Sequence, residues 1–407
     1  MLMFRCFDCT KFLFSIFLIT SSTFLSAQEN KNSFEIYGSI FTDVGYDFNT
    51  IDPLWFDVMR PTKLPSFENE FAPGGNIFYS IRQTKFGVKS SVATGMGVMT
   101  TQFDFDFIGF GKNAGQTTFH VVNAYGELGH FGAGQTASAF MNLDVFPETL
   151  DYWGPLSRVF YLNIQLRYIP VKNENSRVVI ALERPGGTSD GGDYKNAIEL
   201  QGIKPVFKYP NLTMHYRRTA SWGHIQLAGI AKSMKWEDVS DTSIYKLAGS
   251  ALGWGFNISS VIKASRNLTL KVQGVYGNGM ENYIADAGAD IGLESNPGDI
   301  YRPFTGKALP VWGFFSFVEI LWNKSLRSSA GYAFESINNS DLQSANAFHH
   351  GQYGLINLRY SPIKYAMVAI EYQYGRRDNF KDGFHSTGNK IQFQCRVNFS
   401  QVFTQPR

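Results

Sequence analysis

Apolar and polar residues alternate along most of this chain. The segment Phe34–Phe48 reads FEIYGSIFTDVGYDF, in which one parity is mostly apolar and the other carries Glu35, Ser39, Asp43 and Asp47. Because successive side chains of a β-strand point to opposite faces, this pattern predicts a strand with one apolar and one polar surface. A soluble β-sandwich has the same local pattern. The order of strands and of long and short loops along the chain is therefore needed to distinguish a sandwich from a membrane β-barrel.

Segments of this kind recur about sixteen times, and long and short connections alternate between them, which is typical of bacterial outer-membrane barrels. The short connections include SVATGMG, Gly129-His130, KNEN and NKS, and the long ones include residues 49–76, 141–155, 185–209 and 279–308. An even number of strands places both ends of the chain on the same side of the membrane, and about sixteen strands enclose a water-filled lumen. The predicted fold is therefore all-β, a transmembrane antiparallel β-barrel with long outer loops.

The last predicted strand, Gly388–Phe399, supports this fold. Its alternate residues are apolar, and Lys390 and Arg396 lie on the opposite face. A Lys or Arg facing lipid at mid-depth costs about 2–4 kcal/mol, so the polar face is expected to line water. One strand departs from the pattern: in FYSIRQTKFGVK the parity that places Lys85 and Lys89 in the lumen places Arg82 outside, unless a β-bulge near Gln83 restores the register.

One long segment does not alternate. MNLDVFPETLDYWGP, residues 141–155, combines the carboxylates Asp144, Glu148 and Asp151 with two prolines and several large apolar side chains. We interpret residues 141–160 as the third long loop, folded into the barrel as a constriction, with Phe146, Tyr152 and Trp153 as its anchors on the wall. An ordinary surface loop with an acidic cluster is the alternative. Arg158, on the return limb, is expected either to neutralise a loop carboxylate or to face the pore.

Strand parity also assigns charged side chains to the lumen wall. Opposite charges across a narrow gap orient a passing solute, and rings of charge select ions. The wall residues predicted to contribute are Lys85, Lys89, Asp104, Asp106, Glu127, Arg167, Arg217, Arg327, Arg359 and Arg396. For any single one of them, a structural ion pair within the wall is the competing explanation.

Composition narrows the class of protein. Of 407 residues, 17% are charged and 15% aromatic, and the formal net charge is +3, which gives no broad basic surface for nucleic acid. Arg5, Lys11, the apolar run Phe12–Leu25 and Ser26-Ala27-Gln28 resemble a signal peptide, predicted as residues 1–27. The mature barrel, 28–407, is then expected in the bacterial outer membrane. It keeps Cys395 alone, which excludes an internal disulfide framework.

The strands and the third loop together resemble the DcaP-like outer-membrane porin family. The resemblance runs through most of the mature chain and is carried by RQTKFGVKS, NAYGELGHFGAGQT, MNLDVFPETLDYWGP, SWGHIQLAGI, LRSSAGY and EYQYGRRDNFKDG. It implies a trimeric porin of about sixteen strands with the third loop inside, through which small anionic, often dicarboxylic, solutes diffuse. The expected partners are those solutes, the outer-membrane lipid bilayer and the barrel-assembly machinery.

Two departures from the family weaken parts of that expectation. Family members tend to carry an Arg where this chain has Leu162, so one basic group near the constriction is missing. Some members have an N-terminal coiled coil, whereas only Gln28–Ser33 precedes the first predicted strand here, which is too short for heptads. Trimerisation is then expected to rest on the barrel wall.

Other functions are less well supported. A non-selective or cation-preferring porin is the nearest alternative. A barrel enzyme would need a nucleophile with a neighbouring histidine, and the histidines are scattered outside any recognisable motif, so no enzyme, cofactor or metal is expected. An adhesin is a further, weaker alternative. The segment DAGAD, Asp286–Asp290, is a weak candidate for calcium, and a solvated outer loop is the preferred interpretation.

Overall fold

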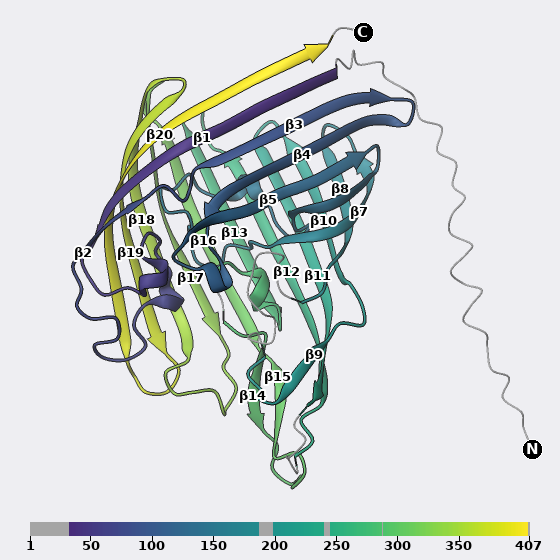
Figure 1. The fold of residues 1–407 in the computed structure, drawn as a ribbon, viewed down its shortest axis with the longest axis vertical. Coiled ribbons are helices and arrows are strands. Elements are labelled where there is room, and N and C mark those ends of the chain that lie inside the picture. The colour runs from purple at the N-terminus through teal and green to yellow at the C-terminus, as the bar shows by residue number, and fades with distance from the viewer. Residues whose placement is uncertain (1–31, 187–197, 240–244, 287, 406–407) are drawn as a thin grey trace, which may run out of the picture.

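The computed structural model describes residues 32–186, 198–239, 245–286 and 288–405. It is an antiparallel β-barrel with short turns at one end and long loops at the other, and the described chain begins and ends at the short-turn end (Figure 1). The strands are β1 (Asn32–Asp47), β2 (Asn76–Ser80), β3 (Lys85–Thr94), β4 (Gly97–Ile108), β5 (Thr117–Leu128), β6 (Phe131–Ala137), β7 (Leu162–Lys172), β8 (Ser176–Glu183), β9 (Ile203–Val206), β10 (Asn211–Ala220), β11 (Gly223–Asp238), β12 (Gly249–Lys263), β13 (Leu268–Asn278), β14 (Ile291–Ser295), β15 (Phe304–Ala308), β16 (Pro310–Leu321), β17 (Leu326–Ile337), β18 (Phe348–Ile363), β19 (Ala366–Asn379) and β20 (His385–Gln405).

The connections contain short 3₁₀ helices. These are η1 (Pro53–Trp55), η2 (Pro61–Lys63), η3 (Gly111–Asn113), η4 (Leu143–Val145) and η6 (Glu281–Tyr283). Among the described residues, no helix has the length and apolar character needed to cross a membrane.

The barrel closes between its first and last strands. β1 pairs antiparallel with β20 along its whole length, from Asn32 opposite Gln405 to Asp47 opposite Lys390. β2 and β3 both pair with β1 and are two parts of a single wall strand, while β9 pairs with the outer end of β11. The closed wall therefore has sixteen strand positions, as the sequence predicts.

The two faces of the wall carry opposite chemistry. Outward side chains are apolar and exposed, with Leu166 and Phe256 each 65% accessible and Ile40 54%. Inward side chains are polar and buried, with Asp43 and Gln392 both at 0%. An apolar exterior around a polar interior suits a barrel surrounded by lipid, and the aromatic residues Trp312 and Trp322 are exposed on that exterior.

Several strand boundaries differ from the prediction. The predicted strand that contains FYSIRQTKFGVK is broken: β2 ends at Ser80 and β3 begins at Lys85, and this break turns Arg82 inward, where it is 2% exposed. Of the two possibilities that the sequence leaves open for Arg82, the irregularity near Gln83 is the one present, and it restores the register of Lys85 and Lys89. β20 continues past Phe399 to Gln405, because β1 offers it backbone partners throughout. The pairing of β14 with β15 in a long loop was not predicted.

Candidate functional site

Residues 138–161, called loop three here, connect β6 to β7 by crossing the inside of the barrel. Their backbone carbonyls accept hydrogen bonds from side chains that the wall points inward. Gln226 donates to Met141 at 2.7 Å, Lys271 to Phe146 at 2.7 Å and Asn357 to Glu148 at 2.9 Å. These donors belong to β11, β13 and β18, so the loop follows the wall around much of the lumen.

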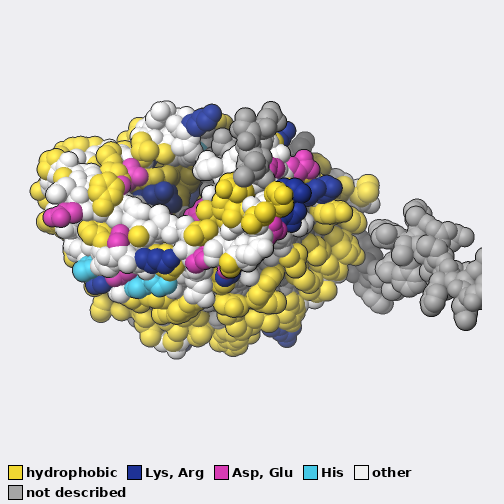
Figure 2. Space-filling view, turned by 90° about the horizontal axis from the view of Figure 1, so that it is seen from below, with side chains coloured by type: hydrophobic (Ala, Val, Ile, Leu, Met, Phe, Trp, Pro, Cys, Tyr) yellow, Lys and Arg dark blue, Asp and Glu magenta, His cyan; other side chains and the backbone are white. Residues whose placement is uncertain are grey.

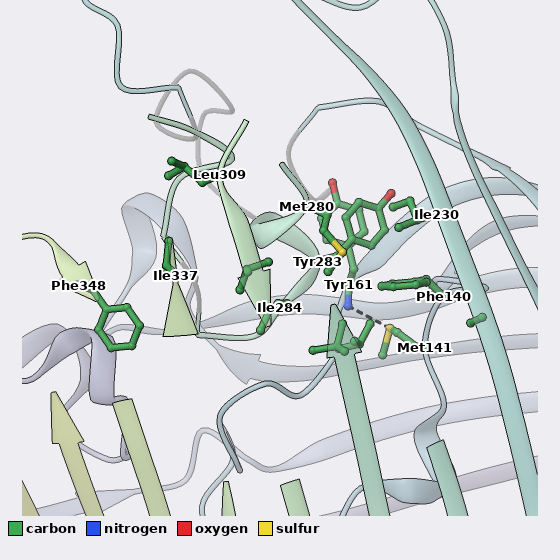
Figure 3. Close-up of a cluster of buried hydrophobic side chains, with 14 residues drawn as sticks. Phe140, Met141, Tyr161, Ile230, Met280, Tyr283, Ile284, Leu309, Ile337 and Phe348 are labelled. Carbon is green, nitrogen blue, oxygen red and sulfur yellow. Dashed lines mark hydrogen bonds between the residues drawn. The ribbon is translucent and has the colours of Figure 1, made fainter. Parts of the chain in front are cut away.

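The root of loop three is fixed by an apolar cluster at the long-loop side. Tyr161 stacks on Tyr283 with their ring centroids 3.9 Å apart, and Phe140 meets Tyr283 edge-on at 6.2 Å (Figure 3). Met141 and Met280 are buried in the same cluster. Because Tyr283 lies in the segment 279–309 between β13 and β16, this cluster joins loop three to another long loop, called loop six here.

The middle of loop three is held by two buried carboxylates. Glu371 of β19 accepts from the backbone N–H of Leu150 at 2.8 Å and of Asp151 at 3.0 Å. Asp151 accepts from the Tyr353 hydroxyl at 2.9 Å and from Trp153 N–H at 3.1 Å. Burial, and secondarily the nearby Glu371, raises the pKa of Asp151 to about 7. Asp151 is thus an anchor of the loop and not an open channel charge.

The other two loop carboxylates are half-exposed and each meets a wall arginine. Asp144 Oδ2 lies 2.5 Å from Arg217 Nη2, with 56% of the Asp144 side chain accessible. Glu148 forms an ion pair with Arg359, and 50% of the Glu148 side chain is accessible. The structure therefore brings two predicted loop charges against two predicted wall charges.

Arg158 takes neither of its predicted places. It is 8% exposed, and its guanidinium lies 4.9 Å from the ring centroids of both Phe146 and Phe160. It forms no ion pair with a carboxylate in the described part of the chain, and burial lowers its pKa to about 10. Cation–π contact with the loop's own aromatic rings replaces the expected carboxylate. Phe146 and Trp153 are packed as anchors, and the Tyr152 hydroxyl donates to Asp106 at 2.8 Å.

The predicted acidic wall residues are all engaged. Asp104 accepts from the Tyr37 hydroxyl at 2.6 Å, and Asp106 lies 2.8 Å from His120 Nδ1. Glu127 forms ion pairs with Lys172 and Arg177. Among the basic predictions, Arg167 is also engaged, since it donates to Gln165 at 2.7 Å and to a backbone carbonyl.

Four predicted basic residues differ from the acidic ones. No described carboxylate forms an ion pair with them; they are Lys85, Lys89, Arg327 and Arg396. They lie on β3, β17 and β20, and Arg359 lies on β18, which pairs with β17. Arg327 is directly opposite Arg359, Arg396 is opposite Phe41, and Lys85 is opposite Ser39 two residues along β1. Together with Arg359 they form what we call the basic wall.

Seen from the long-loop end, the molecule is hollowed, with basic side chains beside the opening (Figure 2).

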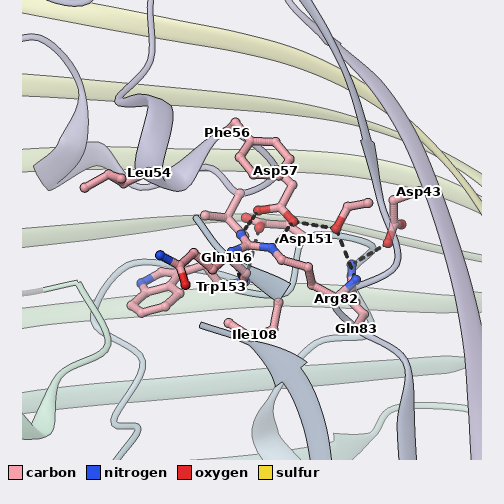
Figure 4. Close-up of polar contacts among 12 residues, drawn as sticks. Asp43, Leu54, Phe56, Asp57, Arg82, Gln83, Ile108, Gln116, Asp151 and Trp153 are labelled. Atoms are coloured by element: carbon pink, nitrogen blue, oxygen red, sulfur yellow. Dashed lines mark hydrogen bonds and ion pairs between the residues drawn. The ribbon is translucent and has the colours of Figure 1, made fainter. Parts of the chain in front are cut away.

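Residues 48–75, called loop one here, were predicted only as a long polar loop, yet they also enter the barrel. Asp57 forms a buried ion pair with Arg82, and Arg82 donates to the Gln116 carbonyl at 3.4 Å (Figure 4). The signal was present in the sequence, because PLWFDVMR combines a proline, two aromatic residues and two charged residues with apolar ones, much as the 141–155 segment does.

The DAGAD segment is neither solvated nor arranged for calcium. Asp286 is 1% exposed and binds Arg60, while Asp290 is 0% exposed and binds Lys232 at 2.6 Å. The described residues contain no group of three or more potential ligands that could hold a metal ion. The expectation of a solvated loop was wrong, because loop six packs on loops one and three and its carboxylates serve as anchors.

Comparison with known proteins agrees with this architecture. The family model described as DcaP outer membrane protein matches residues 18–399. The chain belongs to the DcaP outer membrane protein family. Its structure matches the outer membrane channel DcaP of Acinetobacter baumannii with a TM-score of 0.73 and 17% identity, over 91% of this chain and 98% of that one. Comparison with curated protein sequences gives no significant match.

Other porins share the fold at lower identity. An anion-selective porin from Comamonas acidovorans matches with a TM-score of 0.59 and 8% identity, over 91% of this chain and 100% of that one. OmpF of Salmonella typhi, solved with daunomycin, matches with a TM-score of 0.54 and 11% identity, over 92% and 99%. This DcaP family member is thus a non-enzymatic channel of the bacterial outer membrane. Leu162 is 3% exposed at the start of β7.

Proposed function

We propose that this DcaP family channel passes small hydrophilic anions, dicarboxylates among them, by passive diffusion. The observation that carries the proposal is the imbalance of free charge in the lumen. Asp144 and Glu148 are each neutralised by a wall arginine, and Asp151 is buried. The basic wall retains cations with no carboxylate partner among the described residues, so the exposed charge favours anions.

Loop three and the basic wall have separate tasks in this proposal. Loop three narrows the lumen, and its carboxylates hold it to the wall. The basic wall then offers an anion several cationic positions in succession. Arg396 lies opposite Phe41 and Lys85 opposite Ser39, two residues apart along β1, and neither forms an ion pair with a described carboxylate. Two such cations suit a solute that carries two carboxylates, because each can bind one of them.

The comparisons give this proposal limited support. The family resemblance implies dicarboxylate solutes and a homotrimer, and one structure with the same fold is called an anion-selective porin. At 8% identity that likeness extends to the fold alone. Assembly as a trimer through the barrel wall, export by the 1–27 signal peptide, which lies outside the described residues, and insertion by the barrel-assembly machinery are parts of the same proposal.

A cation-preferring or non-selective channel is the second candidate. It is favoured by the accessibility of Asp144 and Glu148, whose side chains are about half open to the lumen at 56% and 50%. In water, an exposed ion pair contributes only about 0–1 kcal/mol, so a passing cation could compete with Arg217 or Arg359.

Solute uptake distinguishes the two candidates. Proteoliposomes holding the purified channel should swell faster in a dicarboxylate than in a dication or an uncharged sugar of similar size. A double variant, Arg327→Gln with Arg396→Gln, should lose the dicarboxylate preference and keep sugar uptake. Equal rates for all three solutes in the unaltered protein would support the non-selective channel, and faster dication uptake would support the cation-preferring one.

A further inference from the structure

Loop one is bound to the inner wall along most of its length. Lys390 donates to the Phe56 carbonyl at 2.9 Å, and Arg377 donates to the Thr62 carbonyl at 2.6 Å. Asn379 donates to the Ser66 carbonyl at 2.8 Å. These wall residues lie on β19 and β20, next to the closure of the barrel at β1. Loop one is therefore a structured part of the barrel interior.

The wall is shaped to receive it. A Cβ atom added at Gly375 of β19 would lie 2.6 Å from the Met59 sulfur, and one at Gly388 of β20 would lie 2.8 Å from a Leu64 methyl. Met59 and Leu64 are 1% and 2% exposed. They share an apolar cluster with Val145 and Leu156 of loop three and with wall residues such as Tyr353. Two wall glycines thus make room for loop one, which packs directly against loop three.

Arg60 joins loop one to both neighbouring loops. Its guanidinium lies 4.1 Å from the Trp55 ring and 3.8 Å from the Trp153 ring of loop three. The two indoles are themselves 4.9 Å apart, nearly perpendicular. Arg60 Nε also donates to Asp286 of loop six at 2.8 Å, and Asp286 accepts from Thr62 N–H at 3.0 Å. One buried side chain therefore touches three loops that are distant in sequence.

We propose that loop one is a second constriction element of this channel, and that Arg60 is the positioning residue that holds loops one, three and six as one body. Loop three alone then does not set the pore size. A planar guanidinium suits this place because it can stack on two indoles and still bind a carboxylate at its edge. The proposal concerns pore size and is independent of the charge preference proposed above.

The test is single-channel conductance and the exclusion limit for uncharged sugars, measured on the full-length protein in planar bilayers and proteoliposomes. Gly375→Leu places a side chain where Met59 lies and should displace loop one. Arg60→Gln removes the contact shared by the three loops. Both variants should raise conductance and admit larger sugars. Trp153→Ala removes the indole of loop three that Arg60 contacts. If Arg60 and Trp153 hold the same assembly of loops, the double variant Arg60→Gln with Trp153→Ala should differ little from either single variant.

Matched controls separate loop position from general damage. Gly354→Leu introduces the same residue on the adjacent strand, where an added Cβ meets its nearest neighbour at 3.7 Å. Arg376→Gln removes a rim arginine that pairs with Asp378 of its own strand. Both should behave as the unaltered channel. The proposal is overturned if folded Gly375→Leu and Arg60→Gln conduct and exclude sugars normally, even with lowered thermal stability. If either variant fails to fold, the isosteric variant Asp286→Asn removes the charge that Arg60 binds. It should likewise raise conductance and admit larger sugars, and normal values would overturn the proposal.

Discussion

Asp144 of loop three and Arg217 of β10 form an ion pair inside the barrel, with Oδ2 and Nη2 2.5 Å apart. Glu148 meets Arg359 in the same way farther along the loop. The most visible acidic residues of the constriction are thus balanced by the wall they face. The charge that remains free lies on the basic wall, and this relationship is the basis of the expected selectivity.

Replacing Glu148 tests that balance. Glu148→Gln leaves Arg359, which is 6% exposed, without its carboxylate partner and adds one free cation beside Arg327. The reversal potential across a salt gradient should shift toward stronger anion preference, with conductance little changed. Glu174→Gln, at the exposed KNEN turn, is the control and should cause no shift. A shift toward cations in Glu148→Gln would contradict the account.

Glu371 is expected to matter through loop position and not through its charge. Its carboxylate accepts the backbone N–H groups of Leu150 and Asp151. Glu371→Ala would leave buried donors unsatisfied, at a cost of about 1–3 kcal/mol each. We expect a lower unfolding midpoint and larger fluctuations of the open-channel current. Unchanged current noise in a folded variant would show that loop three is held elsewhere.

The pH dependence of loop three should follow Asp151. Burial raises the pKa of this carboxyl from 3.8 to about 7, so the folded state binds a proton more tightly than the unfolded chain. Stability from this group is therefore fully present below about pH 4 and is lost as pH rises toward and through 7. Current noise should therefore increase as pH rises from about 4 through about 7, the range spanned by that shift. Asp151→Asn, which cannot ionise, should show a smaller increase.

The outer surface gives a prediction about folding. Leu166 is 65% exposed and lies in the middle of β7, facing outward. Leu166→Arg should cost about 2–4 kcal/mol in a bilayer, because a charge at this depth must leave water. Reversible unfolding from lipid vesicles measures the change. Asn113→Arg, in an exposed outer loop, should fold as the unaltered protein does; equal losses for both would place β7 outside the membrane.

The sequence predicted the barrel well because strand parity is a local property. Ile40 faces outward and Asp43 inward as their positions in the alternation require, and both follow from the chemistry of lipid and water alone. The orientation of Arg82 stayed open in the sequence because a break between β2 and β3 changes parity, and no residue type marks that break unambiguously.

The loops were predicted less completely because their partners are distant in sequence. The 141–155 segment was found from its refusal to alternate, but the burial of Asp151 depends on Tyr353 and Glu371, about two hundred residues later. Arg158 was misplaced because its partners are aromatic rings and not carboxylates. The inward path of loop one depends on Gly375 and Gly388, whose role appears only when strands β19 and β20 are placed against it.

The most direct test of the central claim is the reversal potential of the purified channel across a potassium chloride gradient, compared with a variant that carries Lys85→Gln, Arg327→Gln and Arg396→Gln. The unaltered channel should be anion-selective, and the variant should lose that selectivity, because Asp144 and Glu148 remain paired while the free cations are removed. A cation-selective unaltered channel, or an unchanged reversal potential in the variant, would show that the basic wall does not set the selectivity.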